Sequence, residues 1–387
     1  MRTTLIVGLV VALSILAGVF LLHDAALELS DLDPYDSQTD ADGTINLAPY
    51  LEESLSRSGL PALGAIVVSR DAVLGSGFVG ARKADTDEPV HIDDAVHIGS
   101  LTKALTGVLA AILVEDGLID WETTPGDVLG PAYGPLPGAW SDVTLQRLLR
   151  MTAGVTRTPQ VSAVFERRLE SPDRAADGRM QRAELAEALF AQSPGHQPGS
   201  RIEYSNHSYA LAGHMLETVT EESFEELMKR RLFTPLGMHS GGFGAPADVW
   251  GHDDRGRPVA PGPAADNPAM LSPAGRAHMS LADYGRFMQF ILARQDDASS
   301  LLSAQGFDAL FEPAQADGEP YAMGWEVRDE MGPDATVLAH TGSNTLWYAY
   351  VWIALEADFG VMVVTNQGGA GTELDAIVWR LVTAHFD

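Results

Sequence analysis

The sequence predicts an α/β protein of the α+β type, in which one antiparallel sheet combines N- and C-terminal strands of a domain and a mostly helical segment is inserted between them. β-Rich runs lie at residues 62–83 and again at 335–367. Residues 118–330, by contrast, show mostly helical patterns that Gly/Pro-rich loops interrupt. Helices flanking such a sheet bury its apolar faces. We therefore expect one domain over residues 45–387, with a helical subdomain roughly at 118–330.

The N-terminus predicts export. Residues 5–22 form an apolar run that only Ser14 and two glycines interrupt. This run is longer than the usual signal-peptide core of about 7–15 residues and close to the roughly 17–25 residues that span a bilayer. Arg2 precedes the run and no Lys or Arg follows before Arg57, so the positive-inside rule places the remaining chain outside the cytoplasm. We expect residues 1–22 to be a signal-anchor facing the periplasmic or extracellular side, or a signal peptide whose cleavage releases a secreted protein.

Charge and composition narrow the classes of partner. Residues 23–44 contain seven acidic and no basic side chains, which predicts an acidic, solvated linker. The formal net charge of −28 argues against nucleic acid as a partner, because phosphate binding needs clustered Lys and Arg. The chain has no cysteine, which excludes disulfides and thiolate nucleophiles. Membrane contact is expected through the N-terminal segment only.

Within the domain, residues 47–60 have helical spacing and end at a glycine that precedes Pro61, and residues 62–83 read as a β-hairpin. Residues 97–117 predict a buried helix that ends at Gly117. The expected later helices are 143–155 with Thr144 as N-cap, 207–219, 223–233 with Ser223 and Glu226 in capping-box spacing, and 280–294. Strand-like runs at 335–342, 346–355 and 359–367 precede a closing amphipathic helix at 371–386.

The buried helix has an unusual first turn, with Ser100 followed three residues later by Lys103, one of only three lysines in the chain. Burying an unpaired ammonium costs several kcal/mol. Residues i and i+3 share one helix face, and a desolvated lysine can take the proton of a neighbouring serine hydroxyl. The alternative is an ordinary hydroxyl at the helix start with Lys103 extending to solvent. The motif alone leaves both interpretations open.

A second motif, Tyr204-Ser205-Asn206, precedes the helix at 207–219. A tyrosine near a cationic lysine can titrate below its reference pKa of about 10, which would make Tyr204 a proton shuttle for a serine. The Asn206 amide offers a carbonyl and an NH₂ group that can orient a substrate. The structural alternative is a buried tyrosine with Asn206 as a helix N-cap.

A third motif, His340-Thr341-Gly342-Ser343, ends a predicted strand. A glycine there lets a ligand approach the strand closely, and the following N–H group can act as an oxyanion donor. His340 would face the same cleft, although a lone histidine is more often structural. A further cluster of His239, His252, Asp253 and Asp254 lacks a helical i, i+4 ligand pair, and "DDRGRP" reads better as a hairpin turn than as part of a metal site.

The order of these motifs, Ser-x-x-Lys, then Tyr-x-Asn, then His-Thr-Gly, resembles the serine penicillin-recognising enzymes of the class C β-lactamase-like family. That family also holds D-Ala-D-Ala carboxypeptidases, D-amino-acid peptidases and carboxylesterases. The resemblance covers residues 45–386 and implies a β-lactamase/transpeptidase-like fold. Further similar stretches are "VTLQRLLRMTAGV", "YSNHSYALAGHMLETVTEESFEELMKRRLFTPLGM", "YAMGWEV" and "VVTNQGG".

The resemblance implies a role for each motif and requires neither metal nor organic cofactor. Ser100 is the implied acylated nucleophile, with Lys103 and Tyr204 as its proton-transfer partners. Asn206 is implied to orient the acyl-side amide of the substrate. On the third motif, the backbone N–H of Ser343 joins that of Ser100 in an oxyanion hole, His340 lies by the leaving group or a carboxylate, and Thr341 and Gly342 complete the substrate-binding strand.

Two departures from the family pattern bear on the substrate. His340 stands where β-lactamases of this class carry lysine, and a histidine is only partly charged near neutral pH, which disfavours a dedicated β-lactamase without excluding a peptidase. Residues 151–154 read Met-Thr-Ala-Gly where His-Thr-Ser-Gly is common. The predicted function is a serine hydrolase that cleaves small amides or short peptides, of the D-amino-acid or D-Ala-D-Ala type, or esters. The alternatives are a β-lactamase and a non-catalytic, surface-anchored binding protein on the same scaffold.

Overall fold

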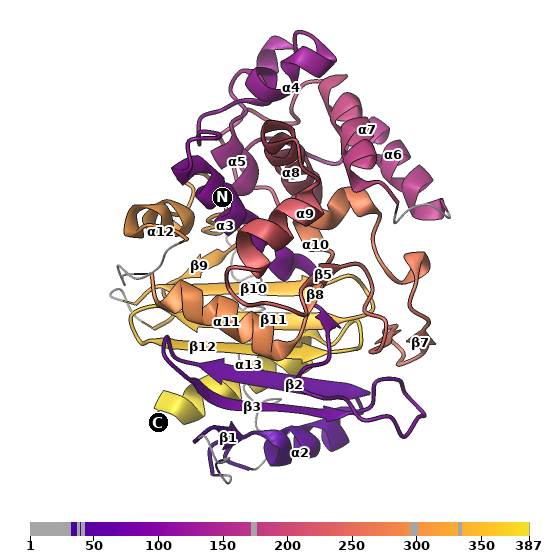
Figure 1. The fold of residues 1–387 in the computed structure, drawn as a ribbon, viewed down its shortest axis with the longest axis vertical. Coiled ribbons are helices and arrows are strands. Elements are labelled where there is room, and N and C mark those ends of the chain that lie inside the picture. The colour runs from indigo at the N-terminus through magenta and orange to yellow at the C-terminus, as the bar shows by residue number, and fades with distance from the viewer. Residues whose placement is uncertain are drawn as a thin grey trace, which may run out of the picture.

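The computed structural model describes residues 32–36, 39, 43–171, 176–294, 301–331 and 335–386. Its centre is a seven-stranded sheet in the order β1-β3-β2-β12-β11-β10-β9 (Figure 1). All neighbours pair antiparallel except β1 and β3. The strands are β1 (Ile45–Asn46), β2 (Ala62–Val68), β3 (Val73–Gly80), β9 (Glu326–Arg328), β10 (Val337–Ser343), β11 (Tyr348–Ala354) and β12 (Phe359–Thr365). The sheet therefore unites both ends of the domain, as the sequence predicts.

Both faces of this sheet are covered, which explains why the central strands β2 and β12 are buried at every position rather than at alternate ones. On one face, α2 (Ala48–Ser58) and α13 (Gly371–Phe386) pack against residues such as Val67, Trp352 and Val363. On the other, α11 (Leu281–Leu292) packs against the alternate residues, among them Ile66 and Met362. Figure 1 shows α11 in front of the strands and α13 behind them.

The helical subdomain lies beyond the β10–β9 edge of the sheet (Figure 1). Its elements are α4 (Pro125–Tyr133), α5 (Leu145–Leu149), α6 (Pro159–Glu170), α7 (Gly178–Phe190), α8 (Asn206–Thr220), α9 (Phe224–Met228), a π-helical turn (Lys229–Phe233) and α10 (Ser272–Gly275). Small strands accompany it: β4 (Val96–His97) pairs with β8 (Ala277–Met279), which also pairs with β5 (Gly242–Phe243), and β6 (Gly251–His252) pairs with β7 (Pro258–Val259). Helix α12 (Ala304–Phe311) closes the segment that returns to the sheet.

Local sequence signals set several element ends. Gly59 adopts φ +70° at the end of α2, and Gly117 adopts φ +70° just after α3 (Thr102–Glu115). Thr144 caps α5 by accepting the N–H of Arg147, and Ser223 caps α9 in the same way. The β6–β7 pair confirms the predicted turn at "DDRGRP", where His252 is buried and its Nδ1 contacts the Asn366 carbonyl oxygen at 2.7 Å.

Part of the predicted linker packs on the domain, so the expectation of a fully solvated spacer is wrong at Tyr35. Its hydroxyl donates a hydrogen bond to the carbonyl oxygen of Leu381 at 2.9 Å, and its ring lies 5.8 Å from that of His385. Tyr35 is therefore half-buried against the end of α13, although its chain neighbours include aspartates. The predicted signal or anchor at residues 1–22 lies outside the described residues. Among the described helices, none has the length and apolar character needed to cross a bilayer.

Candidate active site

Ser100 lies in a tight turn that directly precedes the buried helix α3. Residues Gly99–Leu101 form a 3₁₀ turn, with Gly99 at φ +52°, and α3 starts only at Thr102. The Thr102 hydroxyl donates to the Gly99 carbonyl oxygen at 2.6 Å and so tightens the turn. Every residue of α3 from Thr102 through Leu113 is buried, whereas Ser100 remains partly exposed. The turn thus presents the Ser100 hydroxyl to solvent from a rigid base.

Lys103 is fully buried, and its ammonium nitrogen has three oxygen partners. It donates to Ser100 Oγ at 3.0 Å, to Asn206 Oδ1 at 2.7 Å and to the Ala274 carbonyl oxygen at 2.6 Å. Each of these acceptors is uncharged, so burial dominates and holds the pKa of Lys103 well below its usual value. A lysine of lowered pKa in contact with a serine hydroxyl can act as its base.

Tyr204 approaches Ser100 from the other side. The residue as a whole is 51% exposed, but its hydroxyl is buried and hydrogen-bonds with the Ser100 side chain. The Lys103 nitrogen lies 4.7 Å from the centre of the Tyr204 ring. Burial of the hydroxyl raises the pKa of Tyr204, so the expected lowering by Lys103 is wrong. The reason is that burial disfavours the charged phenolate, and this effect outweighs the hydrogen bond with Ser100, which lowers the pKa.

Asn206 opens α8 but does not cap it. Ser205 is the N-cap residue, since its hydroxyl accepts the N–H of Ser208 at 3.2 Å. The Asn206 side chain is therefore available to contact Lys103. The structure brings Ser100, Lys103, Tyr204 and Asn206 together from two elements about a hundred residues apart.

Two glycines allow the Ser100 turn to pack directly on the end of β10. A Cβ atom at Gly342 would lie 2.1 Å from the Ile98 carbonyl oxygen and 3.0 Å from the Ser100 nitrogen. A Cβ atom at Gly99 would lie 2.3 Å from the Ser343 nitrogen. Side chains at either position are excluded, and the amide nitrogens of Ser100 and Ser343 are brought to the same place. Two neighbouring backbone amides beside a nucleophile are the components of an oxyanion hole.

His340 lies on β10 next to this site but is held as a neutral ring. It is only 3% exposed, its Nδ1 lies 2.6 Å from the Thr341 carbonyl oxygen, and its Nε2 lies 3.2 Å from the hydroxyl of Tyr321. Nδ1 therefore carries the proton, and Nε2 accepts from Tyr321. Burial, followed by the proximity of Lys103, lowers the pKa of His340 to about 3. Sequence reasoning did not assign Tyr321 to the site, although the family-similar stretch "YAMGWEV" begins with it.

The lowered pKa of His340 predicts a specific pH dependence of stability. In the unfolded chain the ring takes up a proton near pH 6.5, whereas in the fold it does so only near pH 3. The contribution of neutral His340 to the free energy of unfolding is thus fully present above about pH 6.5 and is lost as pH falls, at about 1.4 kcal/mol for each pH unit. Urea unfolding at several pH values between about 7 and 4.5 should show a shallower acid loss in His340→Gln than in the wild type. Equal slopes in the two proteins would contradict the assignment.

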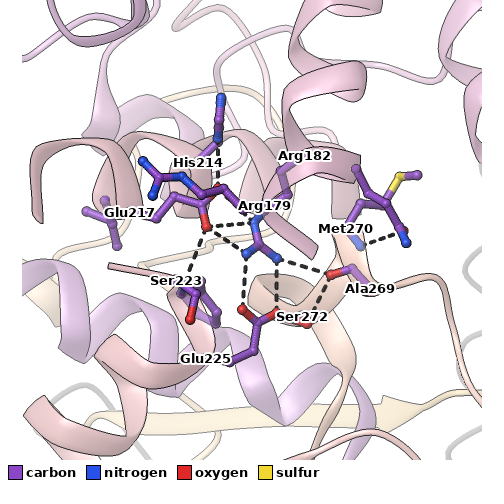
Figure 2. Close-up of polar contacts among 12 residues, drawn as sticks. Arg179, Arg182, His214, Glu217, Ser223, Glu225, Ala269, Met270 and Ser272 are labelled. Carbon is purple, nitrogen blue, oxygen red and sulfur yellow. Dashed lines mark hydrogen bonds and ion pairs between the residues drawn. The ribbon is translucent and has the colours of Figure 1, made fainter. Parts of the chain in front are cut away.

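A buried ion-pair cluster positions the Ala274 carbonyl oxygen that Lys103 contacts. Figure 2 shows Arg182 of α7 bound to Glu217 of α8, with a shortest distance of 2.7 Å, and to Glu225 of α9, at 3.1 Å. Arg182 also donates to the Ala269 carbonyl oxygen at 3.1 Å. Ala269 opens the short turn that leads directly into α10. The cluster therefore anchors the segment that carries Ala274 over the site.

The domain matches a known protein family over nearly its whole length. The sequence model of the family described as Beta-lactamase matches residues 47–384, which is nearly the whole domain. The chain belongs to the β-lactamase family. All three motifs lie within the matched range, and the fold is of the serine-hydrolase type that this family shares with penicillin-binding proteins.

Curated relatives are distant. Protein flp of Staphylococcus aureus (strain MW2) is 21% identical over 320 residues, which are 82% of this chain and 61% of that protein. The chain therefore spans less than two thirds of the length of this relative. Penicillin-binding protein 4 of Amycolatopsis lactamdurans is 24% identical over 337 residues, 82% of this chain and 83% of the relative.

Two solved structures share the fold. One is the octameric penicillin-binding protein homologue from Pyrococcus abyssi, with a TM-score of 0.70 and 20% identity over 86% of this chain and 76% of that one. The other is D-alanine carboxypeptidase AmpC from Burkholderia cenocepacia, with a TM-score of 0.68 and 21% identity over 85% of this chain and 95% of that one. At such identities the likeness concerns the fold and leaves the substrate of this chain open.

Proposed function

We propose that the protein is a serine hydrolase that works through an acyl-enzyme on Ser100 and cleaves small amides, short peptides or esters. The observation that carries this proposal is the fully buried Lys103, whose nitrogen lies 3.0 Å from Ser100 Oγ and whose pKa burial lowers. A structural lysine would place its charge in water or against a carboxylate, whereas Lys103 is buried and, within the described part of the chain, its nitrogen contacts only uncharged oxygens. The arrangement instead suits the activation of a serine.

Acylation then follows from the contacts of Ser100. Neutral Lys103 accepts the hydroxyl proton while Oγ bonds to the substrate carbonyl carbon, and the carbonyl oxygen becomes an oxyanion at the amides of Ser100 and Ser343. Tyr204, which keeps its proton because its pKa is raised, donates that proton to the leaving nitrogen or oxygen as the tetrahedral carbon expels it. The proton on Lys103 restores Tyr204. Water attacks the acyl-enzyme by the same route, releasing the acid and free Ser100.

The state of His340 favours some substrates over others. A carboxylate placed beside it would meet a neutral ring whose Nδ1–H is already directed to the Thr341 carbonyl oxygen. Uncharged esters and amides lose nothing by this, whereas substrates that depend on a carboxylate contact, such as β-lactams, gain little there. Peptides with a D-configured or C-terminal residue stay within the proposed class, and a β-lactamase is the less supported alternative.

The decisive experiment separates a hydrolase from a binding protein on the same scaffold. Purified protein is treated with a fluorophosphonate probe and then digested and mapped by mass spectrometry. We expect an adduct on Ser100 and none in Ser100→Ala. Hydrolysis is then compared on nitrocefin, p-nitrophenyl acetate and butyrate, a D-Ala-D-Ala peptide and D-aminoacyl amides. A wild-type protein that forms no adduct and turns over none of these substrates would remove the hydrolase proposal.

His340→Lys tests the role of the neutral ring directly. An added ammonium at this position supplies a charge-assisted contact for a carboxylate, so β-lactam acylation should rise by about tenfold or more, the factor that 1.4 kcal/mol represents. Stopped-flow measurement of nitrocefin acylation at neutral pH gives the rate, and His340→Gln serves as the uncharged control. If lysine and glutamine variants acylate equally, His340 does not face the substrate carboxylate.

We also propose that the domain acts outside the cytoplasm, with residues 1–22 as its only membrane contact. The apolar run and the position of Arg2 support this placement. Fractionation of cells that express the full chain should recover it with membranes or outside the cytoplasm, and deletion of residues 1–22 should retain it in the cytoplasm. Recovery of the full chain in the cytosolic fraction would contradict the proposal.

A further inference from the structure

Asp266 is a buried carboxylate outside the three motifs, and its neighbours lead to both halves of the oxyanion hole. Its side chain is 1% exposed. Its Oδ1 lies 3.1 Å from His97 Nε2 and 3.3 Å from Asn344 Nδ2, and its Oδ2 accepts from Arg276 Nε at 3.2 Å. Burial alone would raise the pKa of Asp266, but the hydrogen bond from His97 and the charge of Arg276 outweigh it and hold the pKa below its usual value. Asp266 is therefore an anionic acceptor at neutral pH.

His97 connects Asp266 to the turn that carries Ser100. Its Nδ1 accepts the backbone N–H of Gly99 at 3.0 Å, so Nδ1 carries no proton and Nε2–H is directed at Asp266. The His97 ring also stacks on Trp347, with centroids 5.5 Å apart. The orientation of the ring that holds Gly99, the residue before Ser100, is thus fixed on one edge by Asp266.

Asn344 connects Asp266 to the second amide of the oxyanion hole, that of Ser343, because Asn344 directly follows Ser343 in the chain. Its Nδ2 donates to the Ala265 carbonyl oxygen at 3.1 Å as well as to Asp266. Its Oδ1 accepts the backbone N–H groups of Leu346 and Trp347, at 3.1 and 3.3 Å. The side chain therefore closes the turn after β10 and ties it to the Asp266 segment.

We propose that Asp266 is a positioning residue that holds the amides of Ser100 and Ser343 in register, acting through His97 and Asn344. The inference rests on the proposed acyl-transfer function. The same oxygen, Asp266 Oδ1, contacts both His97 and Asn344. A change at Asp266 therefore loosens the supports of both oxyanion-hole amides at once. The nearby strands do not replace this role: the β4–β8 pairing fixes the backbone of His97 but not the direction of its ring.

The protein offers a control that separates positioning from simple stabilisation. Asp283 is also a buried aspartate, 4% exposed, in the first turn of α11, and its carboxylate accepts the Ser240 N–H at 2.7 Å. Among the described residues, its side chain bonds with Ser240 and Arg286 and not with the Ser100 turn or the end of β10. Asp283→Asn should lower thermal stability without changing catalysis, whereas Asp266→Asn should change catalysis beyond its effect on stability.

The experiment measures kcat and KM for p-nitrophenyl butyrate, the inhibition constant of phenylboronic acid, and the melting temperature. A boronate adduct on Ser100 places an oxygen in the oxyanion hole, so its affinity reports that hole. In Asp266→Asn, kcat and boronate affinity should each fall by about 100-fold, the cost of a displacement of roughly 1 Å, with little change in KM. His97→Gln, which keeps a donor toward Asp266 but loses the acceptor for Gly99, should fall similarly. His97→Asn keeps that acceptor and should lose less.

The inference is overturned if the folded Asp266→Asn protein matches Asp283→Asn in kcat and in boronate affinity. It is also overturned if kcat falls while boronate affinity stays at the wild-type value, since the oxyanion hole would then be intact. Should Asp266→Asn fail to fold, the comparison of the two His97 variants decides in the same way. A wild-type protein that neither hydrolyses esters nor forms a boronate or fluorophosphonate adduct defeats the proposed function, and this inference falls with it.

Discussion

Replacing Lys103 by methionine is expected to lower the rate of Ser100 acylation by about 10,000-fold, as removal of a member of a nucleophile–base unit does in serine hydrolases. Methionine approximates the length and volume of the lysine stem but offers no lone pair to accept the Ser100 proton. In the wild type the Lys103 nitrogen lies 4.7 Å from the centre of the Tyr204 ring, and the methionine side chain can still pack against this ring. The loss should therefore be chemical rather than conformational.

The measurement is the rate of fluorophosphonate labelling together with kcat/KM for p-nitrophenyl butyrate. Lys229→Met is the matched control, because Lys229 is an exposed lysine and has no hydrogen bond with Ser100 among the described residues. Stability should change far less than activity: removing a buried amine relieves desolvation, which offsets the lost partners of Asn206 Oδ1 and the Ala274 carbonyl oxygen. A folded Lys103→Met protein that labels at the wild-type rate would show that Ser100 is not activated by this lysine.

Replacing Tyr204 by phenylalanine is expected to lower turnover of amide substrates by a factor of about 100 to 10,000, the usual range for a general acid–base group. The raised pKa of Tyr204 keeps its hydroxyl protonated, so the proposed role is donation to the leaving atom. Phenylalanine keeps the ring and removes only that donor. A p-nitrophenolate leaving group needs no proton, so the loss on p-nitrophenyl esters should be much smaller than the loss on amides.

The comparison of kcat for a D-aminoacyl amide and a p-nitrophenyl ester tests this difference. Tyr284→Phe is the control, since Tyr284 is a buried tyrosine in α11 whose hydroxyl has no hydrogen-bond partner among the described residues. Its loss should leave both activities at the wild-type level. Equal losses on amide and ester in Tyr204→Phe would reassign the tyrosine to the attack step, and no loss on either would make its role structural.

The sequence predicted the sheet, and the division of its strands between the two ends of the domain, because the signals for strands are local. Apolar runs of strand length at 62–83 and 335–367 indicate strands wherever they pair, and glycine at 59 or 117 ends a helix because few other residues adopt a positive φ there. The three motifs were visible for a similar reason: each places its reactive residue types within four positions of one another. Their order along the chain sufficed to indicate the family that the domain-wide match shows.

Tertiary structure alone decided the chemistry of these residues, because protonation depends on burial and on partners that are distant in the chain. The pKa of Tyr204 is raised where local reasoning expected it lowered, and His340 is neutral because it is buried and lies close to Lys103. One partner of Lys103 is the backbone oxygen of Ala274, an atom that any residue at that position would supply. Asp266 has no local pattern at all, since its contacts with His97 and Asn344 span 169 and 78 residues. The sequence by itself determined which residues could react, and the fold determined which of them hold a proton and which hold the others in place.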